Sequence, residues 1–290
     1  MAPLTPDTPP HTALRRIVAE CHADLLKYRA IVLAGRRAIG IHQTRVALRR
    51  MRAALGLFRG AVEGPTEGRI VRALAAEAKW LAGECGPARD LHVFLTETAQ
   101  EVPIEVKRIA ARLAKLHYDR ARTALSGARY NAFDGQLTAF VEAAPAAPPT
   151  EPSDRLEDFG RALLVQHHAK VERRGQHLKS LDHEELHRLR IAIKKLRYAA
   201  GFLRPVFASE GAKAYIEATT RLQGALGAMN DRAVAGRMLD DIAVAARPTE
   251  NVEEALRRLA KQAASGDKRR RQKLQQAWKQ FKEAERFWRA

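Results

Sequence analysis

The chain has 290 residues, of which 46% are hydrophobic and only 6% aromatic, and it carries a formal net charge of +18. This length allows a sizeable core in one or two domains, and the abundance of Ala, Leu, Arg and Glu favours helices over strands. So large a positive excess opposes compaction by self-repulsion, which indicates an anionic partner. Charge alone does not choose among nucleic acid, an anionic membrane and a phosphate polymer.

Several features bear on the cellular compartment. Two cysteines, Cys21 and Cys85, are too few for a disulfide framework, which favours a reducing environment. The start, "MAPLTPDTPP", lacks the basic and apolar regions of a signal peptide, and no run of 18 apolar residues is present to span a membrane. We therefore expect a cytoplasmic protein.

Prolines mark the organisation of the chain. Residues 1–10 contain four prolines, and we expect this segment to be disordered. Helical periodicity then runs through a first half, residues 11–144, with a break at Gly86–Pro87. A second proline cluster, "PAAPPTEPSD" at residues 145–154, predicts a linker. Residues 155–290 form a second helical half, and neither half alternates apolar and polar residues as a strand does.

The two halves share sequence motifs in the same order. "HQTRVALRRMR" starts at His42, and "HRLRIAIKKLR" starts 145 residues later at His187. Further along, "GECGPARD" in the first half matches "GALGAMND" in the second, which aligns Asp90 with Asp231. Matched blocks in one order indicate duplication. The sequence therefore predicts an all-α protein whose two halves arose by internal duplication and pack about a pseudo-twofold axis.

The two histidine-led segments predict amphipathic helices with a polar face of one sign. At 100° per residue, Arg45, Arg49 and Arg52 fall beside His42. Arg190, Lys194 and Arg197 fall beside His187 in the same way. No carboxylate occurs in residues 25–62 or 186–209, although Glu and Lys four apart stabilise an ordinary solvated face. The pattern favours a trough for an anion with many charges, to which Arg, Lys and His all donate hydrogen bonds.

The basic faces and their histidines allow other interpretations. The basic faces could serve solubility, with counter-charges supplied by neighbouring helices. Few aromatic residues lie along them for base stacking, which makes nucleic acid a weaker candidate. A phosphate-binding loop, a catalytic triad and clustered metal ligands are all missing from the sequence. An enzyme acting on phosphoanhydrides, with His42 or His187 as acid or acceptor, stays as a second alternative.

Two further segments favour a structural role. Asp90 and Asp231 follow a glycine-rich break and are expected to cap a helix or stabilise a tight turn, with the alternative of orienting a basic residue of the trough. The basic C-terminal segment could lie on a membrane surface. Because Trp278 and Phe281 match Tyr130 and Phe133 in spacing, it is interpreted instead as the last helix of the second half.

The paired "HQTRVALRRMRAALGLF" and "HRLRIAIKKLRYAAGFL", with "LGAMND" after the second, resemble the CHAD family, named for a conserved-histidine α-helical domain. The resemblance covers residues 11–290 and implies two pseudo-symmetric antiparallel four-helix bundles. It implies binding of inorganic polyphosphate in a basic groove or pore. Carried onto this chain, it implies contacts from His42, Arg45, Arg49, Arg50 and Arg52 on the first helix, and from His187, Arg190, Lys194, Lys195 and Arg197 on the second.

The resemblance also implies a role and partners. We expect a non-catalytic binding protein without cofactor or metal. The family suggests an association with polyphosphate granules or with a separate CYTH-type enzyme, because the strands of a CYTH tunnel are missing here. The first helix departs from the family pattern at Ala53, where the second has Tyr198.

Overall fold

The computed structural model describes residues 3–35, 37–62, 64–97, 103–143, 155–207, 210–245, 253–254, 256–258 and 267–289. The side chains at positions 37, 97, 230–238, 240 and 267 are outside this description. Within the described residues the secondary structure is helical throughout, without a strand, which confirms the all-α prediction. Duplication into two pseudo-symmetric four-helix bundles stays a prediction. The proposed linker at residues 145–154 lies outside the described residues.

The first half folds into six α-helices among its described residues: α1 (Pro10–Leu33), α2 (Arg37–Leu57), α3 (Gly64–Glu84), α4 (Gly86–Glu97), α5 (Ile104–Ser126) and α6 (Ala128–Glu142). A 3-10 turn at Phe58–Ala61 follows α2. Gly35, with φ of 86°, lies between α1 and α2, and its left-handed conformation is one that glycine adopts without a Cβ penalty. Pro87 stands at the start of α4, where a helix tolerates proline and where the sequence predicts a break.

The second half contains α7 (Leu156–Gly175), α8 (His183–Leu203), the long α9 (Gly211–Ala245) and α11 (Asp267–Glu283), with a 3-10 turn at Arg204–Val206 after α8. A capping box fixes the start of α8. The Glu185 backbone N–H donates to the Asp182 carboxylate at 2.8 Å, and the Asp182 N–H donates to the Glu185 carboxylate at 2.9 Å. This start places His187 in the second turn of the helix.

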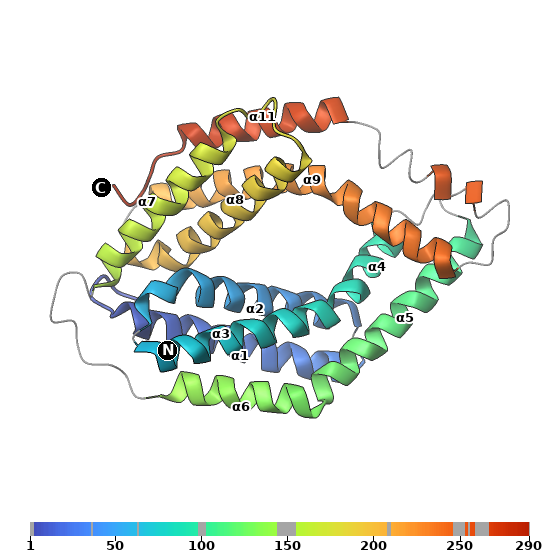
Figure 1. Cartoon of the computed structure of the whole chain (residues 1–290), viewed down its shortest axis with the longest axis horizontal. Coiled ribbons are helices and arrows are strands. Elements are labelled where there is room, and N and C mark those ends of the chain that lie inside the picture. Colours follow the sequence, from blue (N-terminus) through green and yellow to red (C-terminus); the bar gives the residue numbers. More distant parts are fainter. Residues whose placement is uncertain are drawn as a thin grey trace.

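The helices are arranged in two groups that meet at α2 and α8 (Figure 1). In the first group α1, α2, α3 and α6 pack together, and in the second α8 packs against α7 and α9 while α11 packs against α9. One large hydrophobic cluster runs through both groups and includes Leu48, Phe58, Leu189 and Tyr215. A smaller cluster joins α4 and α5 to the far part of α9 through Phe94, among others. Fixed packing on both sides holds the polar faces of α2 and α8 in place.

The N-terminal segment differs from the sequence prediction. Disorder was expected for residues 1–10, but Pro6 and Thr8 are held against the start of α7. The backbone N–H of Leu156 donates to the Thr8 carbonyl at 2.9 Å, and that of Glu157 donates to the Pro6 carbonyl at 3.1 Å. The first N–H groups of a helix have no partner within the helix, so these carbonyls satisfy donors that would otherwise be left unpaired.

The basic C-terminal helix packs as the last helix of the second half. Phe281 is fully buried, and Leu274 and Ala277 join the same core. A Cβ added at Gly175 of α7 would lie 2.1 Å from the ring of Trp278, so the ring fits only against a glycine. This packing opposes the alternative of a membrane-surface helix. None of the helices in the described ranges combines the length and hydropathy that crossing a membrane requires.

Candidate functional site

The candidate site is a basic seam where α2 and α8 pack against each other. We define the basic seam by residues predicted from the two matching motifs. They are His42, Arg45, Arg49 and Arg52 on α2, and His187, Arg190, Lys194 and Arg197 on α8. Apolar residues on the opposite sides of these helices, such as Leu48 and Leu189, are fully buried in the large core. The amphipathic pattern therefore orients both cationic faces.

Lys194 brings the two halves of the seam together. Burial is the main cause that lowers the pKa of its ammonium group from 10.5 to about 8, and the charges of neighbouring arginines add to it. Two of these, Arg49 and Arg52, belong to α2, and the other two, Arg190 and Arg197, belong to α8. Cations 145 positions apart in sequence thus act on one another in the folded chain.

Several seam donors have no acceptor within the described residues. The Nε atoms of Arg49 and Arg190 are buried and lack a hydrogen-bond partner there. Arg52 is exposed, and no described residue forms an ion pair or hydrogen bond with its guanidinium. A buried polar group without a partner costs free energy, so such donors suit an anionic ligand that would accept from them.

Arg45 is the seam residue that contacts α3. Burial lowers the pKa of its guanidinium, and the nearby charge of Asp90 acts in the opposite direction. Its Nη1 donates to the Ala82 carbonyl of α3 at 3.0 Å. A Cβ added at Gly86 would lie 2.9 Å from this same Nη1, so the repeated glycine of the first half gives Arg45 its space.

Asp90 departs from the structural role favoured from the sequence. It lies inside α4, four residues after the first residue Gly86, and not at the helix start, so it is not an N-cap. Its electrostatic effect on Arg45 agrees instead with the alternative role, an acid that orients a basic residue of the trough. The side chain of the matching Asp231 is outside the description.

His42 lies beside a cation that the sequence did not identify. Burial lowers the pKa of its imidazole, followed by the charges of Arg89, Arg49 and Arg45. Arg89 comes from α4, which packs against α2. Its counterpart in the second half is Asn230, which is not a cation. A comparison of the two halves therefore does not identify Arg89 as it identifies the other residues. Only the block "PARD", ending in Asp90, marked this region in the sequence.

Two predicted contact residues point away from the seam. Arg50 lies 3.4 Å from the Glu20 carboxylate and 3.5 Å from that of Asp24, both on α1. Lys195 acts electrostatically on His167 and Lys170 of α7. Each follows a seam residue by one position, and one position turns a side chain by 100° around the helix. The inclusion of Arg50 and Lys195 in one trough is therefore not supported by the geometry.

The far end of the seam is tied to α9. Arg197 donates through Nε to the Gln223 Oε1 at 2.8 Å, and its guanidinium also lies 4.8 Å from the centre of the Tyr198 ring. Tyr198 in turn stacks on Phe202 at 6.0 Å. His187 is exposed near the start of α8. No group of three His, Cys, Asp or Glu side chains in the described ranges is arranged to hold a metal ion.

Comparisons with known proteins agree with the motif resemblance. A family model described as the CHAD domain matches residues 16–240. The crystal structure of the CHAD domain from the plant Ricinus communis is 26% identical and covers 98% of this chain and 95% of its own, with a TM-score of 0.83. PptA from Streptomyces chartreusis shares the fold at 15% identity and a TM-score of 0.63, covering 94% of this chain and 100% of its own. No curated protein matches the sequence significantly.

Proposed function

Because the chain belongs to the CHAD family, we propose that it binds inorganic polyphosphate along the basic seam, without catalysing a reaction of its own. The observation that carries the proposal is the electrostatic environment of Lys194, on which Arg49 and Arg52 act from one helix and Arg190 and Arg197 from the other. Such a concentration of like charge costs stability in the free protein, and a polyanion would relieve that cost.

The extent of the seam favours a polymer over a single phosphate. His42 and Arg52 lie ten positions apart on α2, which corresponds to roughly 15 Å at 1.5 Å per residue. Arg and Lys donors recur at each turn over this length, on both helices. A chain of identical phosphates would place acceptors along the whole row, whereas one phosphate would occupy only one or two donors.

Nucleic acid is a weaker fit for this surface. Bases bind to non-specific proteins largely by stacking on aromatic rings. Tyr198 is the aromatic residue beside the described seam, and its ring is already engaged by Phe202 and by the guanidinium of Arg197. We therefore expect discrimination in favour of polyphosphate at equal charge.

The test is a competition series at fixed salt with polyphosphate, single-stranded DNA, RNA and nucleotides. Polyphosphate should outcompete nucleic acid of equal charge by at least about tenfold, or roughly 1.4 kcal/mol. Equal competition would reveal a non-specific polyanion surface. Release of orthophosphate from the bound chain, if abolished by His42→Gln or His187→Gln, would instead support the phosphoanhydride-processing alternative.

The proposal extends to the cellular setting. A seam-bound polymer would bring this chain to polyphosphate granules in the cytoplasm, or beside a separate CYTH-type enzyme acting on the same polymer. Fractionation of cells for granules, with the wild type and an Arg49→Ala, Arg190→Ala variant side by side, tests it. Granule association independent of these two arginines would mean that another surface makes the attachment.

A further inference from the structure

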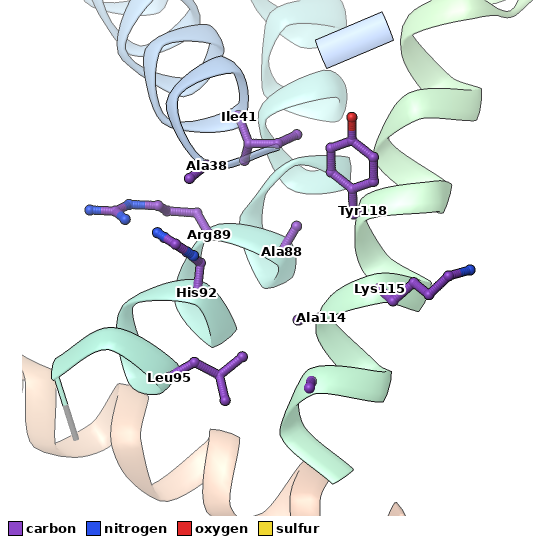
Figure 2. A pocket seen from close by; sticks show the side chains of 10 residues that line it. Ala38, Ile41, Ala88, Arg89, His92, Leu95, Ala114, Lys115 and Tyr118 are labelled. Atoms are coloured by element: carbon purple, nitrogen blue, oxygen red, sulfur yellow. The ribbon is translucent and has the colours of Figure 1, made fainter. Parts of the chain in front are cut away.

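A cavity of about 250 Å³ lies between α2, α4 and α5, outside the basic seam (Figure 2). Its walls are mostly apolar and come from three helices: Ala38 and Ile41, Ala88 and Leu95, and Ala114 and Tyr118. Tyr118 is buried, and its hydroxyl donates to the Val32 carbonyl. The Tyr118 hydroxyl therefore already has a hydrogen-bond partner within the fold, and only the aromatic ring faces the cavity.

The cavity exists because two hydrophobic clusters fail to join. Ala88 and Tyr118 belong to the large core, whereas Leu95 and Ala114 pack against the smaller cluster between α4, α5 and α9. Protein interiors are normally close-packed, with few voids larger than a water molecule. Here alanines from all three helices face each other, and side chains of this size leave the gap unfilled.

The polar groups around the cavity are cationic. Arg89 and His92 of α4 lie side by side at one edge of it with their polar ends directed outward, and Lys115 of α5 points away on the other side (Figure 2). No carboxylate is among the lining residues that the structure describes. Within the described part of the chain, the Arg89 guanidinium and the His92 imidazole have no hydrogen-bond or ion-pair partner. Arg89 also acts on His42, which connects this rim to the basic seam.

From this arrangement we propose that the cavity binds a small amphipathic anion, with one phosphate or carboxylate head on Arg89 and His92 and an unbranched apolar body between the alanine walls. Apolar walls of this kind stabilise a hydrocarbon chain by burial, and the two cations fix its charged end. A nucleotide fits poorly, because none of the described lining residues places a polar side chain in the inner part to hydrogen-bond a base. The site is separate from the proposed polyphosphate site, although Arg89 lines the cavity and its charge also acts on His42 of the seam.

Calorimetric titration of the whole protein with octyl phosphate, below its micelle concentration, tests the proposal. Inorganic phosphate and octanol serve as the two half-ligands. Octyl phosphate should bind at least about tenfold more tightly than either half, because only the complete molecule satisfies both the cations and the walls. Absence of binding to the wild type, or equal binding of octanol alone, overturns the proposal.

Two variants and a control separate this cavity from general hydrophobic adsorption. Ala114→Phe fills the space and should lower octyl phosphate affinity at least about tenfold, and Arg89→Gln should do so by removing the head-group cation. Ala76→Phe places the same ring on an exposed position of α3 and should change nothing. Polyphosphate affinity of Ala114→Phe should stay at the wild-type value, so failure here is distinguishable from failure of the seam. Equal octyl phosphate affinity in Ala114→Phe and Ala76→Phe refutes the site, and Arg89→Gln remains informative if Ala114→Phe does not fold.

Discussion

The outer faces of α2 and α8 present the same motif position in opposite electrostatic settings. On α2, Arg50 lies between the Glu20 and Asp24 carboxylates of α1. On α8, the matching Lys195 faces α7, where Lys170 and His167 feel its charge. The Lys170 ammonium has its pKa lowered by Arg174 first, then by burial, Lys195 and Arg173. The positions turned toward the seam are cationic in both halves. At the outward position, the cation is paired with carboxylates on α2 but faces further cations on α8.

The same contrast appears along the chain. "ECGPARD" ends α3 and starts α4, whereas the matching "ALGAMND" lies inside the uninterrupted α9. Pro87, which cannot donate a backbone hydrogen bond within a helix, is replaced by Ala228. The break turns α4 so that Arg89 reaches His42, and it creates one wall of the apolar cavity. The second half differs on both counts, because α9 continues without a break here and Asn230 stands where the first half has Arg89.

The largest expected effect comes from breaking the seam itself. Arg49→Ala combined with Lys194→Ala removes one inward cation from each half and should weaken polyphosphate binding by about a hundredfold, or roughly 2.8 kcal/mol. Arg50→Ala, the adjacent outward cation, should change affinity less than about threefold because its charge is already paired. Fluorescence anisotropy with labelled polyphosphate at several salt concentrations measures both. The slope of log affinity against log salt should become shallower only for the double variant. An equal loss of affinity in the double variant and in Arg50→Ala would mean that the seam is wrongly placed.

The second prediction concerns His42 and the pH dependence of binding. Burial and Arg89, Arg49 and Arg45 lower its pKa in the free protein. A bound phosphate chain reverses the local field and raises this pKa, so binding takes up protons and affinity grows as pH falls between the two pKa values. One proton changes affinity by up to about tenfold per pH unit. As pH falls from 6.5 towards the lowered pKa of His42, the free protein loses stability, because its unfolded state binds the proton more readily.

Comparison of His42→Gln with His187→Gln sharpens the contrast between the halves. Calorimetry in two buffers of different ionisation enthalpy should show that His42→Gln loses more of the proton uptake on binding than His187→Gln does, because Arg89, Arg49 and Arg45 act on His42 in the free protein. Lys194, with its pKa near 8, should take up protons in a separate window at higher pH. Unchanged uptake in His42→Gln would make that histidine a packing residue.

The repeated glycines provide a third test. A Cβ at Gly86 would lie 2.9 Å from Arg45 Nη1, whereas a Cβ at Gly227 meets nothing within 4 Å. Gly227→Ala should therefore stabilise the protein by up to about 1 kcal/mol, since glycine is the poorer residue inside a helix. Gly86→Ala should gain no stability and should weaken polyphosphate binding a few-fold by displacing Arg45. Thermal unfolding and binding assays on both variants check this, and a matching gain at both sites would show that Arg45 moves aside freely.

Periodicity predicted the helices and the inward cations because those features are local. The buried and cationic arcs of α2 and α8 follow from one helix repeat each, as Leu48 and Arg49 show. Motif membership does not separate inward from outward residues, so the motifs predict Arg50 and Lys195 as ligand contacts together with the residues of the seam. Arg89 was missed because its contact with His42 depends on how α4 packs against α2, which no pattern within either helix contains. The hydrogen bonds of Pro6 and Thr8 with the start of α7 also join segments far apart in sequence, so no local pattern predicts them.

The smallest expected effect tests the outward contrast directly by reversing each charge. Lys195→Glu would face Lys170 and the other cations of α7 and should stabilise the protein by a few tenths of a kcal/mol, the usual size for exposed ion pairs. Arg50→Glu would place a third carboxylate beside Glu20 and Asp24 and should destabilise it by about 0.5–1 kcal/mol, because it loses two attractions and adds two repulsions. Denaturant unfolding at low salt measures both free energies, and the difference between them should shrink as salt screens the charges. If both reversals shift stability in the same direction, the neighbours on α1 and α7 do not set the charge balance of these faces, and the electrostatic contrast between the halves is lost.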